Sequence, residues 1–358
     1  MAIKLLIVDD SALMRRQLTR IFEDTGDFDI RVAKNGKEAI DENLKWQPDV
    51  VTLDINMPEM DGITALAYMM ATRPVPVVMV SSLTEKGALA TFEALALGAI
   101  DYVTKPDGTI SLSIKKIEKE LIAKVRTAAG ARLKIGGKAK ITTEELKAKQ
   151  VPEIKNLTLK QFKDTGVIKN LVLIGVSTGG PSTLEQILPM LPEDYPFPII
   201  VAQHMPSTFT GPFANRLNNL CALNVIEANK LMELKPGTIY IGKGGADVVI
   251  SNRGGQLVVL PRPESPHHLW HPSVEVLGRS ALENLEASRI IAVMLTGMGD
   301  DGAAAFTEIK KKGGRTIAES EDSAVVFGMP KELIERGGAS VVLPLPKIAP
   351  QLISWARN

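Results

Sequence analysis

The chain has 358 residues, 45% of them hydrophobic and 23% charged, and its formal net charge is +1. This length allows two domains with separate cores, and no apolar run is long enough to span a bilayer or to serve as a secretory signal, so we expect a cytoplasmic protein without membrane insertion. The single cysteine, Cys221, excludes an internal disulfide and a cysteine metal cluster.

Strand and helix patterns alternate along residues 1–105, which is typical of a parallel sheet with helices on both faces. Ser11 is the expected N-cap of the first helix because apolar residues recur at helical spacing directly after it. The expected strands are 4–10, 29–33, 50–54, 75–81 and 102–103, and the expected helices begin near residue 11 and span 36–44, 62–71 and 86–97.

Charged and hydroxyl side chains follow successive strands of this block. Asp9 and Asp10 end the first strand, Asp54 ends the third, and Ser81 and Lys105 end the next two. Ligands of such folds bind at the carboxyl ends of strands, where three carboxylates would repel one another. An oxygen-liganded cation such as Mg²⁺ would relieve this repulsion, whereas any one of these acids alone would be an ordinary solvated loop charge.

The block carries four segments that together resemble a response-regulator receiver domain, which is a flavodoxin-like fold: Val8-Asp9-Asp10-Ser11, Leu53-Asp54-Ile55-Asn56-Met57-Pro58-Glu59-Met60-Asp61-Gly62, Val80-Ser81-Ser82 and Tyr102-Val103-Thr104-Lys105-Pro106. The resemblance implies phosphorylation of Asp54 by a chemotaxis histidine kinase. It also implies that Mg²⁺ is held by the acidic cluster and the backbone carbonyl of Asn56. Ser81 and Lys105 would contact the phosphoryl group, and Tyr102 would be the switch aromatic.

The middle of the chain holds the basic residues. Net charge is −6 over residues 1–110, +9 over 111–170 and −2 over 171–358. The segment 111–132 has a helical pattern, and the Lys-rich stretch after it lacks periodicity, so we predict a flexible linker at 126–165 between domains at 1–125 and 166–358. The linker is either a solvated tether or a docking site for an acidic partner. Because neither flanking block is basic, we expect no nucleic-acid partner.

A second alternation of strands and helices begins at Leu171, where an apolar strand runs into the turn Gly175-Val-Ser177-Thr-Gly179-Gly180 and a helical pattern. Ser177 therefore lies at the carboxyl edge of a sheet and near a helix N-terminus, where free N–H groups can stabilise an oxyanion. The turn by itself is equally compatible with a glycine-rich connection without chemistry or with a phosphate cradle.

The next strong strand, at 198–204, ends in Gln203 and His204. A dinucleotide-binding unit would end this strand in an acid and would carry Gly-x-Gly-x-x-Gly in the preceding turn, so a cofactor site is disfavoured. Neighbouring ends of parallel strands are close, and an imidazole there can act as a base for Ser177.

A third strand, at 290–295, runs into a glycine-rich turn that contains Asp300 and Asp301. Ser, His and Asp at three strand ends are the components of an acyl-transfer triad, in a chain order that differs from that of α/β-hydrolases. His267 and His268 lie in a proline-rich loop. His271 is the alternative to His204 as the base.

Five motifs in this block resemble the catalytic domain of the chemotaxis-receptor methylesterases, the CheB family, over about residues 171–345: Ile174-Gly-Val-Ser-Thr-Gly-Gly-Pro181, Gln203-His-Met-Pro206, His271-Pro-Ser-Val274, Leu295-Thr-Gly-Met-Gly-Asp-Asp-Gly302 and Ser323-Ala-Val-Val-Phe-Gly-Met-Pro330. The resemblance implies a doubly wound, Rossmann-like parallel sheet. It implies Ser177 as nucleophile, His204 as general base and Asp301 as the acid, with backbone N–H groups near Met298 as oxyanion donors. The family tends to have Asp where this chain has Glu275.

The resemblance implies a monomeric hydrolase that demethylates glutamyl esters on chemoreceptors and deamidates receptor glutamines, without a cofactor for the esterase reaction. We expect the receiver to obstruct Ser177 until Asp54 is phosphorylated. Two other classes of protein remain in view. A DNA-binding output domain is disfavoured by the acidic second block, and a docking module without catalysis would leave Ser177 idle.

Overall fold

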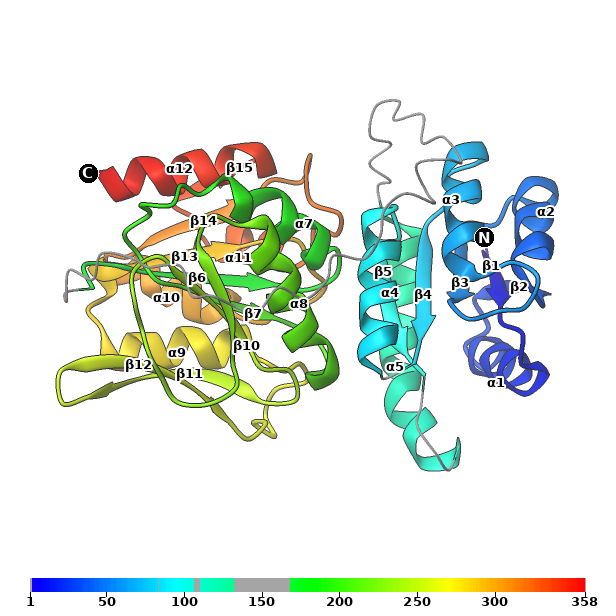
Figure 1. Cartoon of the computed structure of the whole chain (residues 1–358), viewed down its shortest axis with the longest axis horizontal. Helices are drawn as coiled ribbons and strands as arrows, with labels where there is room; N and C mark the ends of the chain where they lie inside the picture. Colours follow the sequence, from blue (N-terminus) through cyan, green and yellow to red (C-terminus); the bar gives the residue numbers. More distant parts are fainter. Residues whose placement is uncertain (1, 83, 106–109, 132–167, 358) are drawn as a thin grey trace.

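The structure, a computed structural model, describes residues 2–82, 84–105, 110–131 and 168–357. It contains an N-terminal and a C-terminal α/β unit (Figure 1). The elements of the N-terminal unit are β1 (Ile3–Val8), α1 (Ala12–Glu23), β2 (Phe28–Ala33), α2 (Gly36–Trp46), β3 (Val50–Asp54), α3 (Gly62–Thr72), β4 (Val77–Ser81), α4 (Glu85–Ala96), β5 (Asp101–Thr104) and α5 (Ile110–Ala129).

The N-terminal sheet has the strand order β2-β1-β3-β4-β5, and every pairing is parallel. This confirms the alternation predicted from the sequence. The Ser11 side chain accepts a hydrogen bond from Met14 N at 3.3 Å, so it is the N-cap of α1, as predicted. The parallel order brings the carboxyl ends of β1, β3, β4 and β5 to one edge, where the predicted acids and Lys105 lie.

The C-terminal unit is built on a seven-stranded parallel sheet with the order β15-β14-β13-β6-β7-β10-β8. Its elements are β6 (Leu171–Val176), α7 (Gly180–Ile187), η1 (Leu188–Met190), β7 (Ile199–Gln203), α8 (Ser207–Leu220), β8 (Asn224–Ala228), β9 (Met232–Glu233), β10 (Thr238–Gly242), β11 (Asp247–Arg253), β12 (Gln256–Arg262), α9 (Val274–Asn284), η2 (Ala287–Arg289), β13 (Ile290–Met294), α10 (Ala303–Lys311), β14 (Arg315–Glu319), α11 (Met329–Glu335), β15 (Val341–Leu343) and α12 (Leu345–Arg357). β6 is central, and its six residues are all buried, as expected for a strand covered on both faces.

β6 pairs with β7 on one side and with β13 on the other. The three strands that precede Ser177, His204 and the Asp300-Asp301 turn are therefore adjacent, as the sequence predicted. A small antiparallel sheet, β11-β12-β9, was not predicted. The loop that follows β12 leads to α9.

The predicted linker, residues 126–165, overlaps the end of a helix. Helix α5 continues to Ala129, so the first residues of the segment 126–165 belong to this helix. Residues 132–165 of the predicted linker lie outside the described residues.

The two units pack against each other through α4 and β5 on one side and α8 on the other (Figure 1). Tyr102 on β5 stacks on Phe209 of α8, with ring centroids 4.7 Å apart. Phe92 of α4 lies 6.0 Å from Phe209 and 5.2 Å from Phe213, measured between ring centroids. All four rings are buried, so the contact between the units has an aromatic core.

Across residues 2–82, 84–105, 110–131 and 168–357, none of the helices combines the length and the apolar character needed to cross a membrane.

Candidate active site and phosphorylation site

Ser177 lies between the end of β6 and the start of α7, in a turn that is tightly surrounded. Its backbone N–H donates to the carbonyl of Thr296 at 3.0 Å, and its own carbonyl accepts from Gly180 N at 2.8 Å. Gly179 has φ = +77°, and a Cβ at Gly180 would lie 2.0 Å from the Gln203 side-chain oxygen. Glycine is therefore required at both positions, which explains the Gly-Gly pair read from the sequence.

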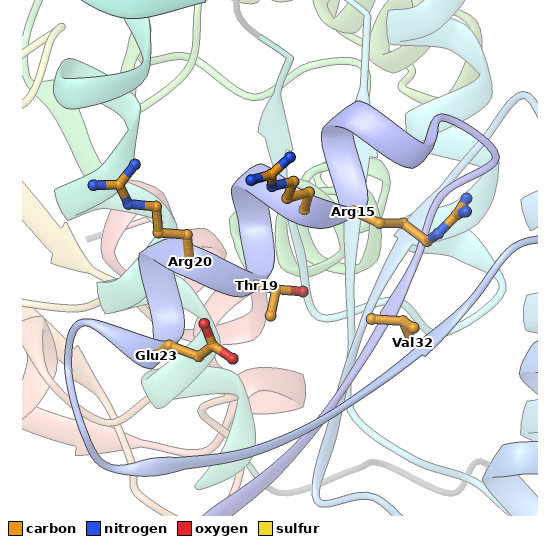
Figure 2. A pocket seen from close by; sticks show the side chains of 6 residues that line it. Arg15, Thr19, Arg20, Glu23 and Val32 are labelled. Carbon is orange, nitrogen blue, oxygen red and sulfur yellow. The ribbon is translucent and has the colours of Figure 1, made fainter.

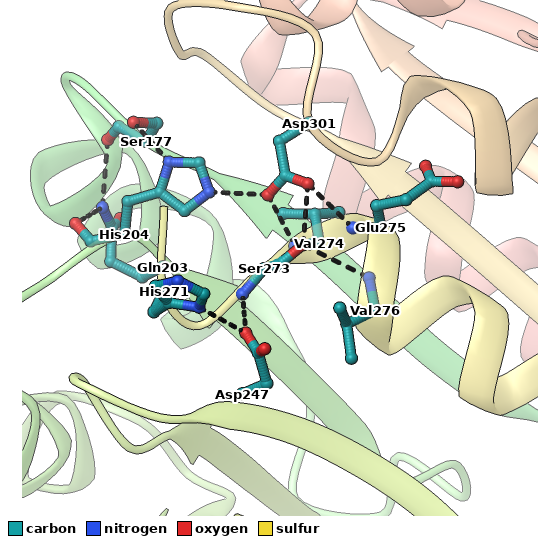
Figure 3. A network of polar contacts seen from close by, with 10 residues as sticks. All are labelled: Ser177, Gln203, His204, Asp247, His271, Ser273, Val274, Glu275, Val276 and Asp301. Carbon is teal, nitrogen blue, oxygen red and sulfur yellow. Dashed lines mark hydrogen bonds and ion pairs between the residues drawn. The ribbon is translucent and has the colours of Figure 1, made fainter. Parts of the chain in front are cut away.

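The structure places Ser177, His204 and Asp301 in one hydrogen-bonded chain (Figure 3). His204 Nδ1 lies 3.0 Å from Ser177 Oγ, and His204 Nε2 lies 2.8 Å from Asp301 Oδ2. A carboxylate accepts only, so Nε2 carries the proton and Nδ1 is left to accept the serine proton; this tautomer is inferred from the contacts. The arrangement can perform nucleophilic acyl transfer.

The N-terminus of α9 holds Asp301 (Figure 3). Its carboxylate accepts hydrogen bonds from Ser273 Oγ at 2.9 Å, Val274 N at 2.7 Å and Glu275 N at 3.0 Å. Burial by itself would raise the pKa of Asp301, but the hydrogen bond from His204 and those from the α9 amides lower it below its usual range. The carboxylate therefore stays ionised beside the imidazole.

Asp300, the neighbouring acid, faces outward. It is exposed and lies 3.0 Å from Arg336 Nη2 on the surface. The structure therefore brings Asp301, and not Asp300, to His204.

The turn that contains Met298 packs directly against Ser177. A Cβ at Gly297 would lie 2.8 Å from Ser177 Cβ. Within the described part of the chain, the backbone N–H of Met298 has no hydrogen-bond acceptor. Such an N–H group is available to a developing oxyanion, as the sequence-based assignment requires.

His271, the alternative base, is directed to another carboxylate. Its Nδ1 lies 2.8 Å from Asp247 Oδ1, an atom that also accepts from Ser273 N at 2.9 Å. His267 and His268 lie in the loop between β12 and α9, as predicted.

Sequence reasoning assigned no role to three side chains near the site. Ser273 caps α9 and contacts Asp301, and its place just before an apolar helical run was a signal for the cap. The ring of Trp270 stacks against that of His204, with centroids 5.8 Å apart and planes at 16°. No local sequence pattern indicated a role for Asp247, because its hydrogen-bond partners lie 18 to 26 residues further along the chain.

The N-terminal unit gathers the predicted acids. Asp9, Asp10 and Asp54 each offer a carboxylate oxygen, and these oxygens lie within 4.8 Å of one another. Lys105 Nζ lies 2.7 Å from Asp54 Oδ2 and 2.9 Å from Asp9 Oδ2, so it forms an ion pair with each carboxylate. A cluster of hard oxygen donors of this kind fits Mg²⁺. Asn56 lies beside it, with its backbone N 3.4 Å from Asp54 Oδ1.

The charges of this cluster perturb one another. Burial raises the pKa of Asp54, the Lys105 ammonium counteracts this, and the charge of Asp9 adds to the rise. Burial alone would lower the pKa of Lys105, but its close ion pairs with Asp54 and Asp9 raise it. Lys105 is therefore a fixed cation between two carboxylates.

Of the three predicted switch residues, Lys105 pairs with Asp54, whereas within the described part of the chain neither Ser81 nor Tyr102 is hydrogen-bonded to that carboxylate. Ser81 Oγ donates to the carbonyl of Gly87 at 3.2 Å. Tyr102 is buried against Phe209, and within the described part of the chain its hydroxyl has no hydrogen-bond partner. Burial raises the pKa of Tyr102 well above its usual value, so its hydroxyl stays protonated.

Helix α1 fixes the backbone around the acids. Arg15 Nη1 donates to the carbonyls of Asp9 at 2.7 Å and Asp10 at 3.0 Å. Figure 2 shows Arg15 at a hollow that α1 forms with Val32 of β2, lined also by Arg16, Thr19, Arg20 and Glu23.

The fold and these two sites define a class of protein in which an aspartate-containing regulatory domain is joined to a doubly wound α/β domain with a serine, a histidine and an aspartate in contact. The response regulator receiver domain model matches residues 5–115, and the CheB methylesterase model matches residues 172–352. The chain belongs to the CheB methylesterase family, and it is an enzyme with an N-terminal receiver domain.

Curated relatives match nearly the whole chain. A protein-glutamate methylesterase/protein-glutamine glutaminase 3 from Rhodospirillum rubrum is 56% identical over 98% of this chain and 96% of its own. A protein of the same name, numbered 2, from Carboxydothermus hydrogenoformans is 50% identical over 99% of each chain. The crystal structure of the Thermotoga maritima CheB methylesterase catalytic domain is 41% identical, with a TM-score of 0.51, and covers 53% of this chain and 100% of that one.

Proposed function

We propose that this chain hydrolyses glutamate γ-methyl esters on chemoreceptors and deamidates receptor glutamines, with Ser177, His204 and Asp301 as the catalytic groups. The observation that carries this proposal is the continuous contact from Ser177 Oγ to His204 Nδ1 and from His204 Nε2 to Asp301 Oδ2. The names of the relatives supply the substrate classes, glutamate esters and glutamine.

In the first half-reaction, Ser177 Oγ attacks the ester carbonyl while His204 Nδ1 takes the serine proton. The tetrahedral oxyanion is stabilised by the backbone N–H of Met298. The C–O bond to the leaving group breaks, and the imidazolium returns its proton to the departing methoxide, which leaves as methanol. The product of this half-reaction is a glutamyl ester of Ser177.

In the second half-reaction, water attacks the acyl group on Ser177, and His204 takes a proton from the water and delivers it to Ser177 Oγ. Asp301 keeps its negative charge throughout and stabilises the imidazolium. A receptor glutamine follows the same route with ammonia as the leaving group, so both activities give glutamate. The esterase reaction needs no cofactor, because this chain's own residues make every proton transfer.

We further propose that the docked receiver restrains the catalytic domain until Asp54 is phosphorylated. The receiver contacts two of the segments that form the site. Asp101 at the start of β5 accepts a hydrogen bond from Thr178 Oγ1 at 2.7 Å, and Thr178 follows the nucleophile. Thr127 of α5 donates to the sulfur of Met298 at 3.0 Å.

A path of contacts supports coupling between phosphorylation and this docking. Lys105 pairs with Asp54, and three residues earlier Tyr102 stacks on Phe209 of α8, the helix that begins three residues after His204. A phosphoryl group on Asp54 draws Ser81 and Lys105 toward its oxygens, and the Tyr102 end of β5 moves with them. The contact with α8 then weakens and the open population rises.

Asp54 acts as the phosphoryl acceptor, with a chemotaxis histidine kinase as the donor. Asp9, Asp10, Asp54 and the backbone carbonyl of Asn56 would hold Mg²⁺, which supplies charge neutralisation for phosphoryl transfer when bound. A docking module without catalysis is the competing function. It would not explain why three amide or hydroxyl groups of α9 hold the carboxylate that orients His204.

The proposal is tested by measuring methanol released from radiolabelled, methylated receptor membranes by the full-length protein, with and without a small phosphodonor and Mg²⁺. We expect release in both cases and a faster rate with the phosphodonor. Ammonia release from unmodified receptors measures the glutaminase reaction in the same preparation. Absence of both products in the presence of phosphodonor would leave the docking module as the better account.

A further inference from the structure

The loop between β12 and α9 exposes a leucine to an unusual degree. Leu269 is 89% exposed, whereas the next most exposed large hydrophobic residue of the described chain, Leu13, is 54% exposed. A single surface leucine needs no explanation by itself. Two features distinguish Leu269: its loop is anchored to a buried carboxylate, and it lies beside the catalytic groups.

The loop is built on a fixed base. Asp247, 2% exposed, accepts hydrogen bonds from Ser265 N at 2.8 Å and Ser273 N at 2.9 Å, and it also contacts His271 (Figure 3). Both ends of the loop are thus tied to one buried carboxylate. Residues 266–270 project from this base, and Leu269 is held out to solvent by it.

The loop also adjoins the catalytic groups on both sides of Leu269. Trp270, the next residue, stacks on the ring of His204. Ser273, where the loop ends, donates to Asp301. Trp270 is half-buried, so an apolar surface runs from the catalytic imidazole outward to Leu269. Leu269 keeps its exposure with the receiver in place, so the receiver is not its partner.

We infer that Leu269 is a specificity-determining residue: it binds an apolar side chain on the polypeptide segment that carries the glutamyl ester. This inference rests on the proposed function. A glutamate side chain reaches Ser177 from a backbone that must lie along the rim of the site, and the surface formed by Trp270 and Leu269 is part of that rim. Leucine offers neither charge nor hydrogen bonds, so it selects for an aliphatic or aromatic neighbour of the modified residue.

The experiment compares two substrates with full-length Leu269→Ala and Leu269→Asp, with phosphodonor present in every assay. Methylated receptor membranes contain the flanking segment, and a single blocked glutamate γ-methyl ester lacks it. We expect kcat/KM on receptor to fall about tenfold for the alanine variant, mainly through KM, and further for the aspartate variant. The rate on the small ester should change by less than about twofold.

Leu44→Ala is the matched control, because Leu44 is a 46% exposed leucine on α2, the helix beside β2 at the far edge of the receiver sheet. It should leave both rates at the wild-type value. An unchanged kcat/KM on receptor in both Leu269 variants would overturn the inference, and so would equal losses on the two substrates. Ser177→Ala is measured alongside; if it retained wild-type activity, the proposed function would fall and this inference with it.

Discussion

At the scale of single residues, His204 presents its two nitrogens in a defined order. Nδ1 faces Ser177 and Nε2 faces Asp301, and the second contact is the shorter, at 2.8 Å against 3.0 Å. The carboxylate that fixes this order is itself fixed by three donors from the start of α9. The start of α9 therefore fixes Asp301, and Asp301 in turn fixes the orientation of the His204 ring.

The first prediction separates the two neighbouring acids. Asp301→Asn should lower kcat by roughly 10³-fold and leave a measurable remainder, because the acid orients the imidazole and does not react itself. Asp300→Asn should lose less than about twofold, since the exposed Asp300 side chain forms a surface ion pair with Arg336. Methanol release measures both. A larger loss in the Asp300 variant would shift the assignment by one residue.

The second prediction concerns Ser273→Ala, which removes one donor to Asp301 and the N-cap of α9. The loss of the cap should lower the free energy of unfolding by about 1 kcal/mol at pH 7, and kcat should fall because the carboxylate is less well held. The pKa of Asp301 lies below its ordinary value, so its stabilising contribution is complete above the unfolded-state pKa and is lost as pH falls through the lower folded-state pKa.

Denaturant unfolding of the wild type and the Ser273 variant at several pH values measures this effect. Removing the hydrogen bond raises the folded-state pKa of Asp301 in the variant, so part of the stability difference should disappear as the carboxyl is protonated below about pH 4. A stability difference that is constant with pH would mean that Ser273 acts on the helix alone.

At the scale of elements, α8 serves both units. It begins three residues after His204, and its Phe209 and Phe213 pack against Phe92 and Tyr102 of the receiver. A helix that both follows His204 and buries the interface aromatics is the element through which the two sites can influence each other.

The third prediction therefore alters this contact from the receiver side. Phe92→Ala should raise the unphosphorylated methylesterase rate by about tenfold, because two aromatic pairs that stabilise the docked form are lost. The stimulation by phosphodonor should shrink by a similar factor. Phe28→Ala is the control, since Phe28 packs on Phe22 and lies on β2, at the edge of the receiver sheet opposite β5. An unchanged basal rate in the Phe92 variant would contradict a restraining interface.

Most of the elements could be predicted, because alternating apolar strands and amphipathic helices mark parallel α/β folds. The meeting of Ser177 and His204 at one sheet edge could also be predicted, because the strand that ends at His204 is the next strand in the sequence after the glycine turn. The contacts of Asp101 with Thr178 and of Tyr102 with Phe209 could not be predicted. They join residues 77 and 107 positions apart across two cores, and no local pattern encodes such docking.

The antiparallel sheet β11-β12-β9 was not predicted. Its strands β11 and β12, Asp247–Arg253 and Gln256–Arg262, are joined by a turn with two glycines at positive φ. Two apolar segments on either side of a Gly-Gly pair are the local signal that predicts such a hairpin. The role of Asp247 at the start of β11 depends on this sheet and was therefore out of reach.

At the scale of the whole molecule, the receiver lies against the catalytic domain through an aromatic core and two polar contacts to the turns that form the site. For a closed form that outnumbers the open form by about 100 to 1, phosphorylation would have to supply roughly 2.7 kcal/mol of differential stability. Under the proposed regulation, a few charge-assisted hydrogen bonds gained around the phosphoryl group on Asp54 would supply this amount.

The fourth prediction tests the restraint. A fragment that begins near residue 150 should be faster than the unphosphorylated full-length protein and indifferent to phosphodonor and Mg²⁺. The related Thermotoga catalytic domain has been crystallised by itself, which indicates that such a fragment folds. Full-length Asp54→Ala should keep the basal rate and lose the response to phosphodonor. A fragment as slow as the unphosphorylated protein would mean that the receiver activates through contacts of its own.

The central claim is that Ser177 is the nucleophile of a receptor methylesterase. The most direct measurement is methanol release from methylated receptor membranes by Ser177→Ala and the wild type, both with phosphodonor, after unfolding curves have shown that the two are equally stable. The account predicts no methanol above the blank for the variant, because no acyl-enzyme can form. Methanol release by Ser177→Ala at the wild-type rate would contradict it.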